Sequence, residues 1–76
     1  MIKILAFGIV AEKIKSSEFY LEDVENTQLL RDLLRTRFPE LAGTKYSVSI
    51  NRKLVHEDVS IDSGSEVALL PPFSGG

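Results

Sequence analysis

A helical repeat of apolar residues in the middle of the chain constrains the fold more than any other feature of the sequence. These residues recur at spacings of three and four, which places them on one face of a helix: Leu30, Leu33, Leu34, Phe38 and Leu41. Asn26 or Thr27 can serve as the N-cap. Pro39 stops the helix, because its ring clashes with the preceding turn. The sequence therefore predicts one main helix between Asn26 or Thr27 and Pro39.

Segments typical of β-strands lie on both sides of this helix. Five of them are expected: residues 1–9, 17–22, 46–51, 54–56 and 66–70. In the third segment Tyr46 and Val48 alternate strictly with Ser47 and Ser49, which indicates a strand with one buried face and one wet face. Residues 10–16 are expected to be the connection between the first two strands.

The order of these elements predicts the fold class. Strand, strand, helix, strand, short strand and strand is the order of a ubiquitin-like β-grasp, an α+β roll with a mixed sheet. One main helix packs on one face of that sheet, so the other face must meet solvent or a partner. We expect residues 1–70 to form the β-grasp domain and residues 71–76 an extended, flexible C-terminal tail.

Charged residues mark the face of the sheet that the helix leaves open. Lys3 shares a face with Phe7 in the first strand, and Glu66 shares one with Leu70 in the last strand. A charged side chain is seldom buried unpaired, so Phe7 and Leu70 should be exposed, and close together if these strands pair. Leu54 is a weaker third candidate. Clustered exposed apolar residues indicate a contact surface, although they could instead pack at a sheet edge or under a loop.

Composition excludes several functions. Nine basic and eleven acidic residues give a net charge of −2, which argues against nucleic acid as the main partner, and Arg31, Arg35 and Arg37 are expected at solvated helix positions. There is no cysteine, so disulfides and thiolate chemistry are excluded and a cytoplasmic location is natural. Residues 4–11 resemble a signal-peptide core, but their removal would take away the first core strand. No apolar run is long enough to span a membrane.

The side chains offer no catalytic constellation of their own. His56 is the only histidine and is expected to be a solvated turn residue, because a metal site needs more ligands than one. The serines have no candidate base. The acidic residues Glu18, Glu22, Asp23 and Glu25 are expected to be solvated surface and helix-start charge. We therefore expect no metal site and no bound cofactor.

The end of the sequence remains as the candidate chemical group. It consists of Pro71, Pro72, Phe73, Ser74, Gly75 and Gly76. The two prolines favour extended backbone, so the segment should project away from the last strand, with a reach of about 20 Å. The two glycines lack side chains and fit a channel too narrow for other residues. Such a tail can deliver its carboxylate, activated by ATP, into the active site of another protein; an unstructured end is the alternative.

Several segments together carry a resemblance to a known family. They are the opening MIKILAF, the helix start NTQLLRDLL, the turn INRKLV, the approach GSEVALLPP and the terminal Gly-Gly. With this order and length, the chain resembles the MoaD family, the small sulfur-carrier subunits of molybdopterin synthase, which are related to ThiS and ubiquitin. The proline pair before the glycines is typical of the molybdopterin branch.

The resemblance implies a mechanism and partners. An E1-like (MoeB-like) enzyme would use ATP to adenylate Gly76, and a sulfur donor would convert it to a thiocarboxylate. The tail would then enter the large (MoaE-like) subunit of molybdopterin synthase, where the sulfur passes to cyclic pyranopterin monophosphate. The family pattern is a heterotetramer of two small and two large subunits. Family contacts with both partners align with Phe7, Leu54 and Leu70.

Three alternatives stay open at this point. The chain could carry sulfur for another pathway, such as thiazole synthesis for thiamine, with the same chemistry. It could be a ubiquitin-like modifier joined through Gly76 to lysines of other proteins. It could also be a β-grasp interaction module with an inert tail, in which case deleting Gly75 and Gly76 would change nothing.

Overall fold

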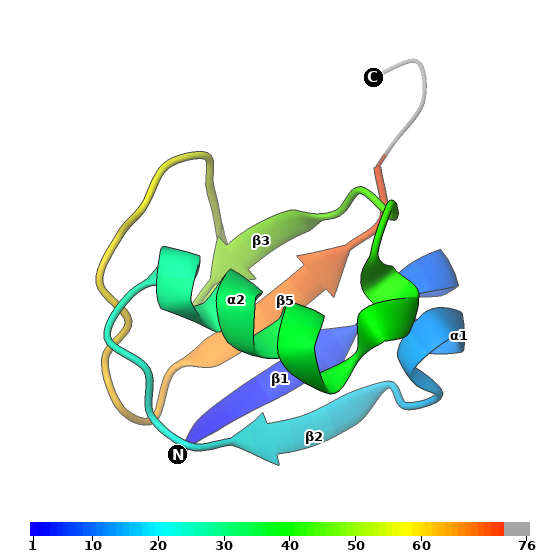
Figure 1. The fold of residues 1–76 in the computed structure, drawn as a ribbon. Helices are drawn as coiled ribbons and strands as arrows, with labels where there is room; N and C mark the ends of the chain where they lie inside the picture. The colour runs from blue at the N-terminus through cyan, green and yellow to red at the C-terminus, as the bar shows by residue number, and fades with distance from the viewer. Residues whose placement is uncertain (73–76) are drawn as a thin grey trace.

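The computed structural model describes residues 1–72, which form a five-stranded sheet with helices on one face (Figure 1). In chain order the elements are β1 (Ile2–Ala6), α1 (Gly8–Ile14), β2 (Glu18–Leu21), α2 (Thr27–Arg37), the 3-10 helix η1 (Pro39–Leu41), β3 (Ser47–Ile50), β4 (Lys53–Val55) and β5 (Glu66–Leu70).

The sheet is mixed, with strand order β2-β1-β5-β3-β4. The central strands β1 and β5 are parallel, and every other neighbouring pair is antiparallel. The first and last strands therefore lie side by side in the middle of the sheet, and the chain leaves the domain from its centre. Helix α2 crosses one face of this sheet (Figure 1).

The connection predicted for residues 10–16 is wrong, because most of it belongs to helix α1. The first strand ends at Ala6, not at residue 9, and the backbone turns at Gly8, whose φ is +57°. Val10 and Ile14, four residues apart, are both buried on the inner side of α1. Lys15 ends the helix in the left-handed conformation, with a φ of 60°.

Helix α2 forms where the apolar repeat predicts it. Asn26 is the N-cap, and its side-chain oxygen accepts a hydrogen bond from the Leu29 amide at 2.9 Å. Leu30 and Leu34 are fully buried against the sheet. The α-helix stops at Arg37, and the chain continues from Pro39 as the 3-10 turn η1.

The core lies between the helices and the inner face of the sheet. Its fully buried large side chains are Ile2, Ile4, Val10, Leu21, Leu30, Leu34, Val48, Val67 and Leu69. Ser49 was predicted to be wet but is also buried, on the other face of the sheet. It lies between Ala68 and Leu54 in the register, and these neighbours cover its small side chain.

A polar cluster ties the loop before β5 to the start of α2. Thr27 is buried, and its hydroxyl donates to Asp58 Oδ1 at 3.0 Å while it accepts from the Val59 amide at 3.0 Å. The Gln28 amide donates to the same carboxylate oxygen at 3.0 Å. Asp58 therefore satisfies a free amide at the helix start, and the loop is held against the domain.

Candidate partner-binding face

The face of the sheet opposite α2 carries the charged marker that the sequence predicts. Lys3 and Glu66 are direct partners in the register of β1 and β5. The Lys3 ammonium also lies 3.8 Å from Glu18 Oε2 on β2. Ile2 and Ile4 point to the other side and are fully buried. The assignment of faces from Lys3 and Glu66 is confirmed.

Phe7 and Leu70 lie side by side at the end of this open face. Phe7 follows β1 with extended backbone, and its amide donates to the Leu69 carbonyl at 3.2 Å. Because Ala6 pairs with Leu69, the register continues one step and sets Phe7 beside Leu70. Phe7 is 46% exposed and Leu70 is half-buried. The strand pairing needed for the predicted cluster is therefore present.

Leu54 lies at the far side of the same face, on the edge strand β4. It is 55% exposed and pairs with Ser49 of β3, while the neighbouring Ser47 pairs with Leu70 of β5. Three strand spacings separate β1 from β4, about 14 Å. In the register of the sheet, Ser47 and Ser49 of β3 thus lie between Leu54 and the apolar residues of β5.

These side chains define a surface that we name the open-face patch. It consists of Leu5, Phe7, Leu54, Ala68 and Leu70. Lys3, Glu18 and Glu66 lie beside it as a charged border. An apolar centre with a charged border is the composition expected of a surface that docks against another protein.

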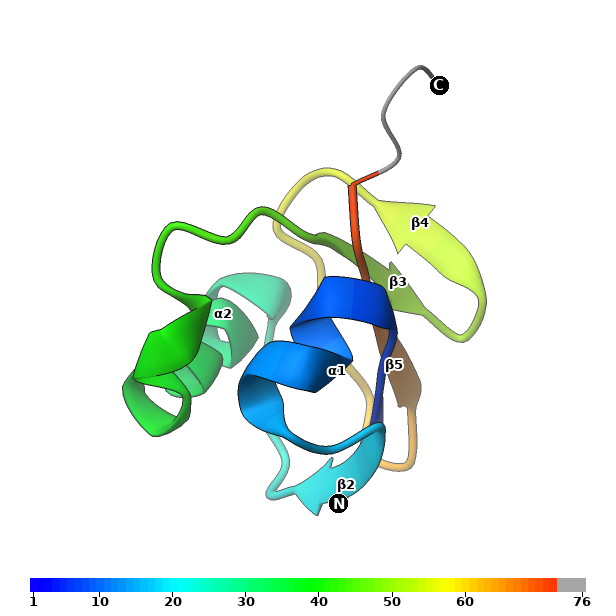
Figure 2. The ribbon, with the colours of Figure 1, turned by 90° about the vertical axis from the view of Figure 1, so that its right-hand side faces the viewer.

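The C-terminal segment begins next to this patch. Figure 2 shows α1 in front of the end of β5, from which the chain continues into Pro71 and Pro72. A Cβ atom built on Gly8 would lie 3.0 Å from Pro71 Cγ. Only glycine combines the φ of +57° with this close approach, so Gly8 determines how closely Pro71 can approach the start of α1.

Gly8 is a positioning residue that the sequence pattern did not single out. A glycine inside an apolar strand-like run is the signal that could have revealed it, since such a residue marks a bend or a close backbone approach. Of the tail residues predicted to act, Pro71 and Pro72 belong to the described part of the chain. Phe73, Ser74, Gly75 and Gly76 lie outside the described residues.

The acidic residues near β2 are exposed and form ion pairs. Glu22 accepts from Arg37 at 2.7 Å, and Asp23 lies 2.9 Å from the amino group of Met1. A hydrogen bond from that amino group, followed by one from Ser63, holds the pKa of Asp23 below its ordinary value. These groups stay on the solvated surface, as predicted.

The other sequence expectations concern metals, membranes and His56. His56 is exposed, as expected. Within residues 1–72, the histidine and acidic side chains form no group of three or more that could hold a metal ion. In the same part of the chain, none of the helices has the length and apolar character that a membrane crossing requires.

One helix position differs from its prediction. Arg31 is half-buried, whereas the sequence placed it in solvent with Arg35 and Arg37. Its guanidinium carbon lies 5.2 Å from the centre of the Tyr46 ring, on the side of the sheet that carries α2. Tyr46 immediately precedes β3, and the alternation there indicates which face it shares with Val48 but not which residue of α2 it contacts.

Together, the mixed sheet, the crossing helix and the strand order define a ubiquitin-like β-grasp domain of the α+β class. A family model described as the ThiS family matches residues 4–76, and the chain belongs to that family. The family match and the shared fold confirm the resemblance at the level of family and fold.

Solved structures of the same fold cover nearly the whole chain. The small archaeal modifier protein 1 from Methanosarcina acetivorans is 20% identical with a TM-score of 0.82, over 99% of this chain and 95% of that one. A putative molybdopterin converting factor subunit 1 from Pyrococcus furiosus is 15% identical, with a TM-score of 0.81 and coverage of 95% and 97%. A chain in a complex of subunits 1 and 2 of molybdopterin-converting factor from Helicobacter pylori is 24% identical, with a TM-score of 0.71 and coverage of 99% and 97%.

Proposed function

We propose that this protein is a cytoplasmic sulfur carrier that bears a thiocarboxylate on Gly76 and donates its sulfur inside molybdopterin synthase. The observation that carries the proposal is the adjacency of two features in a ThiS-family fold. The open-face patch ends at Phe7 and Leu70, and the segment toward Gly76 begins at the next residue, Pro71. A partner docked on the patch would have the start of the tail at its own surface.

The chemistry requires two steps at the carboxyl of Gly76. In the first, an E1-like enzyme joins the carboxylate to the α-phosphate of ATP, which forms the acyl adenylate and releases pyrophosphate. In the second, a sulfur nucleophile attacks the acyl carbon and AMP leaves, so that sulfur replaces one oxygen. The protein itself binds no cofactor in this scheme, and ATP belongs to the activating enzyme. Glycine leaves the acyl carbon open to attack, because it has no side chain.

The proposed acceptor is cyclic pyranopterin monophosphate in a MoaE-like large subunit, with two carriers and two large subunits in the assembly. A Helicobacter pylori complex of subunits 1 and 2 of molybdopterin-converting factor supports such a partner, since one of its chains shares this fold. The same patch would dock in turn on the MoeB-like activating enzyme. Phe7, Leu54 and Leu70 are the proposed contacts for both.

A matched pair of substitutions tests the docking surface. Phe7→Asp places a charge in the patch, whereas Tyr20→Asp places one on the edge strand β2 of the same face, where Tyr20 is 56% exposed and pairs with Lys3, at the other end of β1 from Phe7. Titration calorimetry against the large subunit should show that Phe7→Asp weakens binding by more than about 1 kcal/mol. Tyr20→Asp should leave binding nearly unchanged. Equal effects of the two variants would contradict this use of the patch.

A second candidate function is protein modification. The likeness to small archaeal modifier protein 1 favours it, because that structure shares the fold over nearly the whole chain. The acyl adenylate at Gly76 would then be attacked by a lysine amine of a target, forming an isopeptide bond with loss of AMP. Peptide mass spectrometry of proteins captured with a tagged chain would find lysines linked to Gly76 if this occurs. A sulfur carrier for thiazole synthesis would instead show the thiocarboxylate but no transfer to the pterin.

A further inference from the structure

A pocket of about 330 Å³ lies on the α2 side of the domain, away from the open-face patch. It is bounded by the second half of α2, by η1 with the turn that follows, and by the residue before β3. Its lining residues are Arg31, Arg35, Leu41, Ala42, Gly43, Thr44 and Tyr46. Neither the docking nor the tail chemistry proposed above uses these residues.

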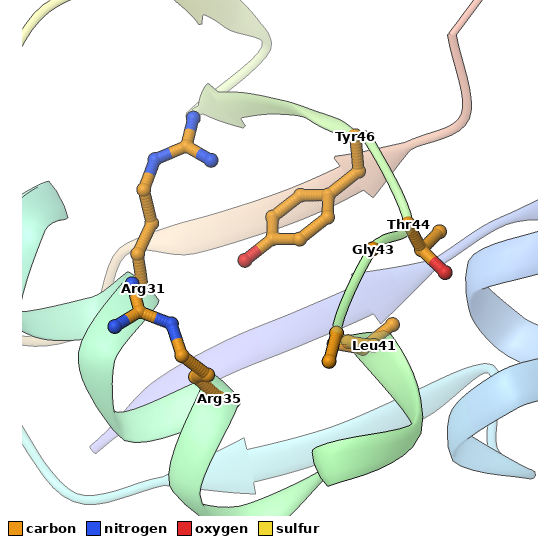
Figure 3. A pocket seen from close by; sticks show the side chains of 7 residues that line it. Arg31, Arg35, Leu41, Gly43, Thr44 and Tyr46 are labelled. Carbon is orange, nitrogen blue, oxygen red and sulfur yellow. The ribbon is translucent and has the colours of Figure 1, made fainter.

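Three side chains that donate hydrogen bonds reach this space from two sides. Arg31 and Arg35 are one turn apart on α2, and the Tyr46 hydroxyl points toward them from across the pocket (Figure 3). The Arg31 guanidinium packs on the Tyr46 ring at 5.2 Å. Stacking of this kind fixes the plane of a guanidinium and therefore the direction of its N–H groups.

The two arginines differ in how far their charge is already compensated. Arg35 lies 3.3 Å from Asp32 Oδ1, which also accepts from the Gln28 amide group at 3.1 Å. Arg31 forms no ion pair with any residue in 1–72. A half-buried guanidinium without a carboxylate partner attracts an anion strongly.

The Tyr46 hydroxyl remains a donor at neutral pH. Burial raises the pKa of Tyr46 above its ordinary value, against the smaller opposing effect of the Arg31 charge. Thr44 offers a second hydroxyl at the edge, and Leu41 with Ala42 provides apolar surface next to the donors. Donors on several sides suit the tetrahedral oxygens of a phosphate, whereas a planar carboxylate is served best by a single guanidinium.

We propose that this pocket binds a phosphate dianion, free or as the head of a small phosphate ester, between Arg31, Arg35 and the Tyr46 hydroxyl. Arg31 supplies the bidentate contact, and Arg35 shares its remaining donors between Asp32 and the ligand. The carbon part of an ester would lie against Leu41. This site is independent of the sulfur-carrier function, so the two proposals can fail separately.

The test is an NMR titration of the whole chain with inorganic phosphate and, separately, with glycerol 3-phosphate, at constant ionic strength. Saturable shifts centred on the amides of Thr44 and Tyr46 are expected with both. Tighter binding of the ester would identify an organic phosphate as the ligand, and equal binding would identify free phosphate. Shifts that do not saturate, or acetate binding as tightly as phosphate, would overturn the proposal.

Variants on α2 make the test specific. Arg31→Ala should weaken phosphate binding by about tenfold or more, the loss expected when a charged hydrogen-bonding partner is removed. Arg35→Ala should weaken phosphate binding as well, and because the Arg35 side chain is exposed, this second variant should keep the stability of the folded chain. Arg37→Ala is the control, because Arg37 is on the same helix but pairs with Glu22. An equal loss of phosphate affinity in Arg37→Ala would show nonspecific attraction to the basic helix and would contradict the proposed site.

Discussion

Replacing Gly8 with alanine tests how the domain directs its C-terminal segment. Gly8 has a φ of +57°, and an added Cβ would lie 3.0 Å from Pro71 Cγ, closer than ordinary van der Waals contact. Two costs therefore apply to Gly8→Ala, one from the backbone and one from crowding. Gly64→Ala separates them, since Gly64 has a φ of +85° but nothing within 4 Å of its added Cβ.

The magnitudes follow from these two geometries. Left-handed backbone costs an alanine about 1–2 kcal/mol. The reduced freedom of the unfolded chain offsets about 0.4–1 kcal/mol of this. A net loss of about 1 kcal/mol in unfolding free energy is expected for Gly64→Ala. Gly8→Ala should lose about 1 kcal/mol more, at the low end of overpacking costs, because only one contact is tight and Pro71 is half-buried.

A double-mutant cycle with Pro71→Ala assigns the extra loss to its cause. Pro71→Ala removes the crowded Cγ, so Gly8→Ala in that background should cost no more than Gly64→Ala. Urea unfolding followed by circular dichroism gives the four free energies. A coupling of zero between Gly8 and Pro71, or equal losses for Gly8→Ala and Gly64→Ala, would refute the reasoning.

Three further predictions concern buried and titrating groups. Thr27→Val should lower the unfolding free energy by about 1–3 kcal/mol, because it leaves polar groups of the loop before β5 unpaired. The control Thr36→Val, at an exposed position of α2, should change the unfolding free energy little, and thermal unfolding compares the two variants. Tyr20→Phe leaves Tyr46 as the one tyrosine, and its absorbance as tyrosinate should then show a pKa above the ordinary tyrosine value. The unfolding free energy should fall as the pH rises past that ordinary value, because Tyr46 ionises in the unfolded chain before it ionises in the folded one. The pKa of Asp23 is lowered, so its stabilising contribution is present above the ordinary value of 3.8 and lost as the pH falls through the folded value; Asp23→Asn should flatten this part of the stability curve.

The predictable part of the fold came from patterns that are local in sequence. Leu30, Leu33 and Leu34 repeat at helical spacing in α2; Leu30 and Leu34 are fully buried and Leu33 is half-buried against the core. Lys3 and Glu66 each mark one face of a strand, so the exposed side of the sheet could be assigned before the pairing of the strands was known. The same argument placed Phe7 beside Leu70 at the end of that face.

The missed features depend on contacts between distant parts of the chain. Helix α1 has only two buried residues, Val10 and Ile14. A single spacing of four does not distinguish a short helix from an irregular connection. The role of Gly8 depends on Pro71, at the other end of the domain. The packing of Arg31 on Tyr46 joins α2 to the residue before β3, and no periodicity within either element encodes it.

The most direct test of the account is the chemical state of Gly76. The full chain is incubated with an E1-like activating enzyme, ATP and sulfide, and is then analysed by intact and fragment mass spectrometry. The proposal predicts that sulfur replaces one oxygen and that fragmentation locates the change at Gly76; oxidation of Met1 gives nearly the same mass, so the location decides. An unmodified Gly76, when the same enzyme converts a known carrier in parallel, would contradict the central claim.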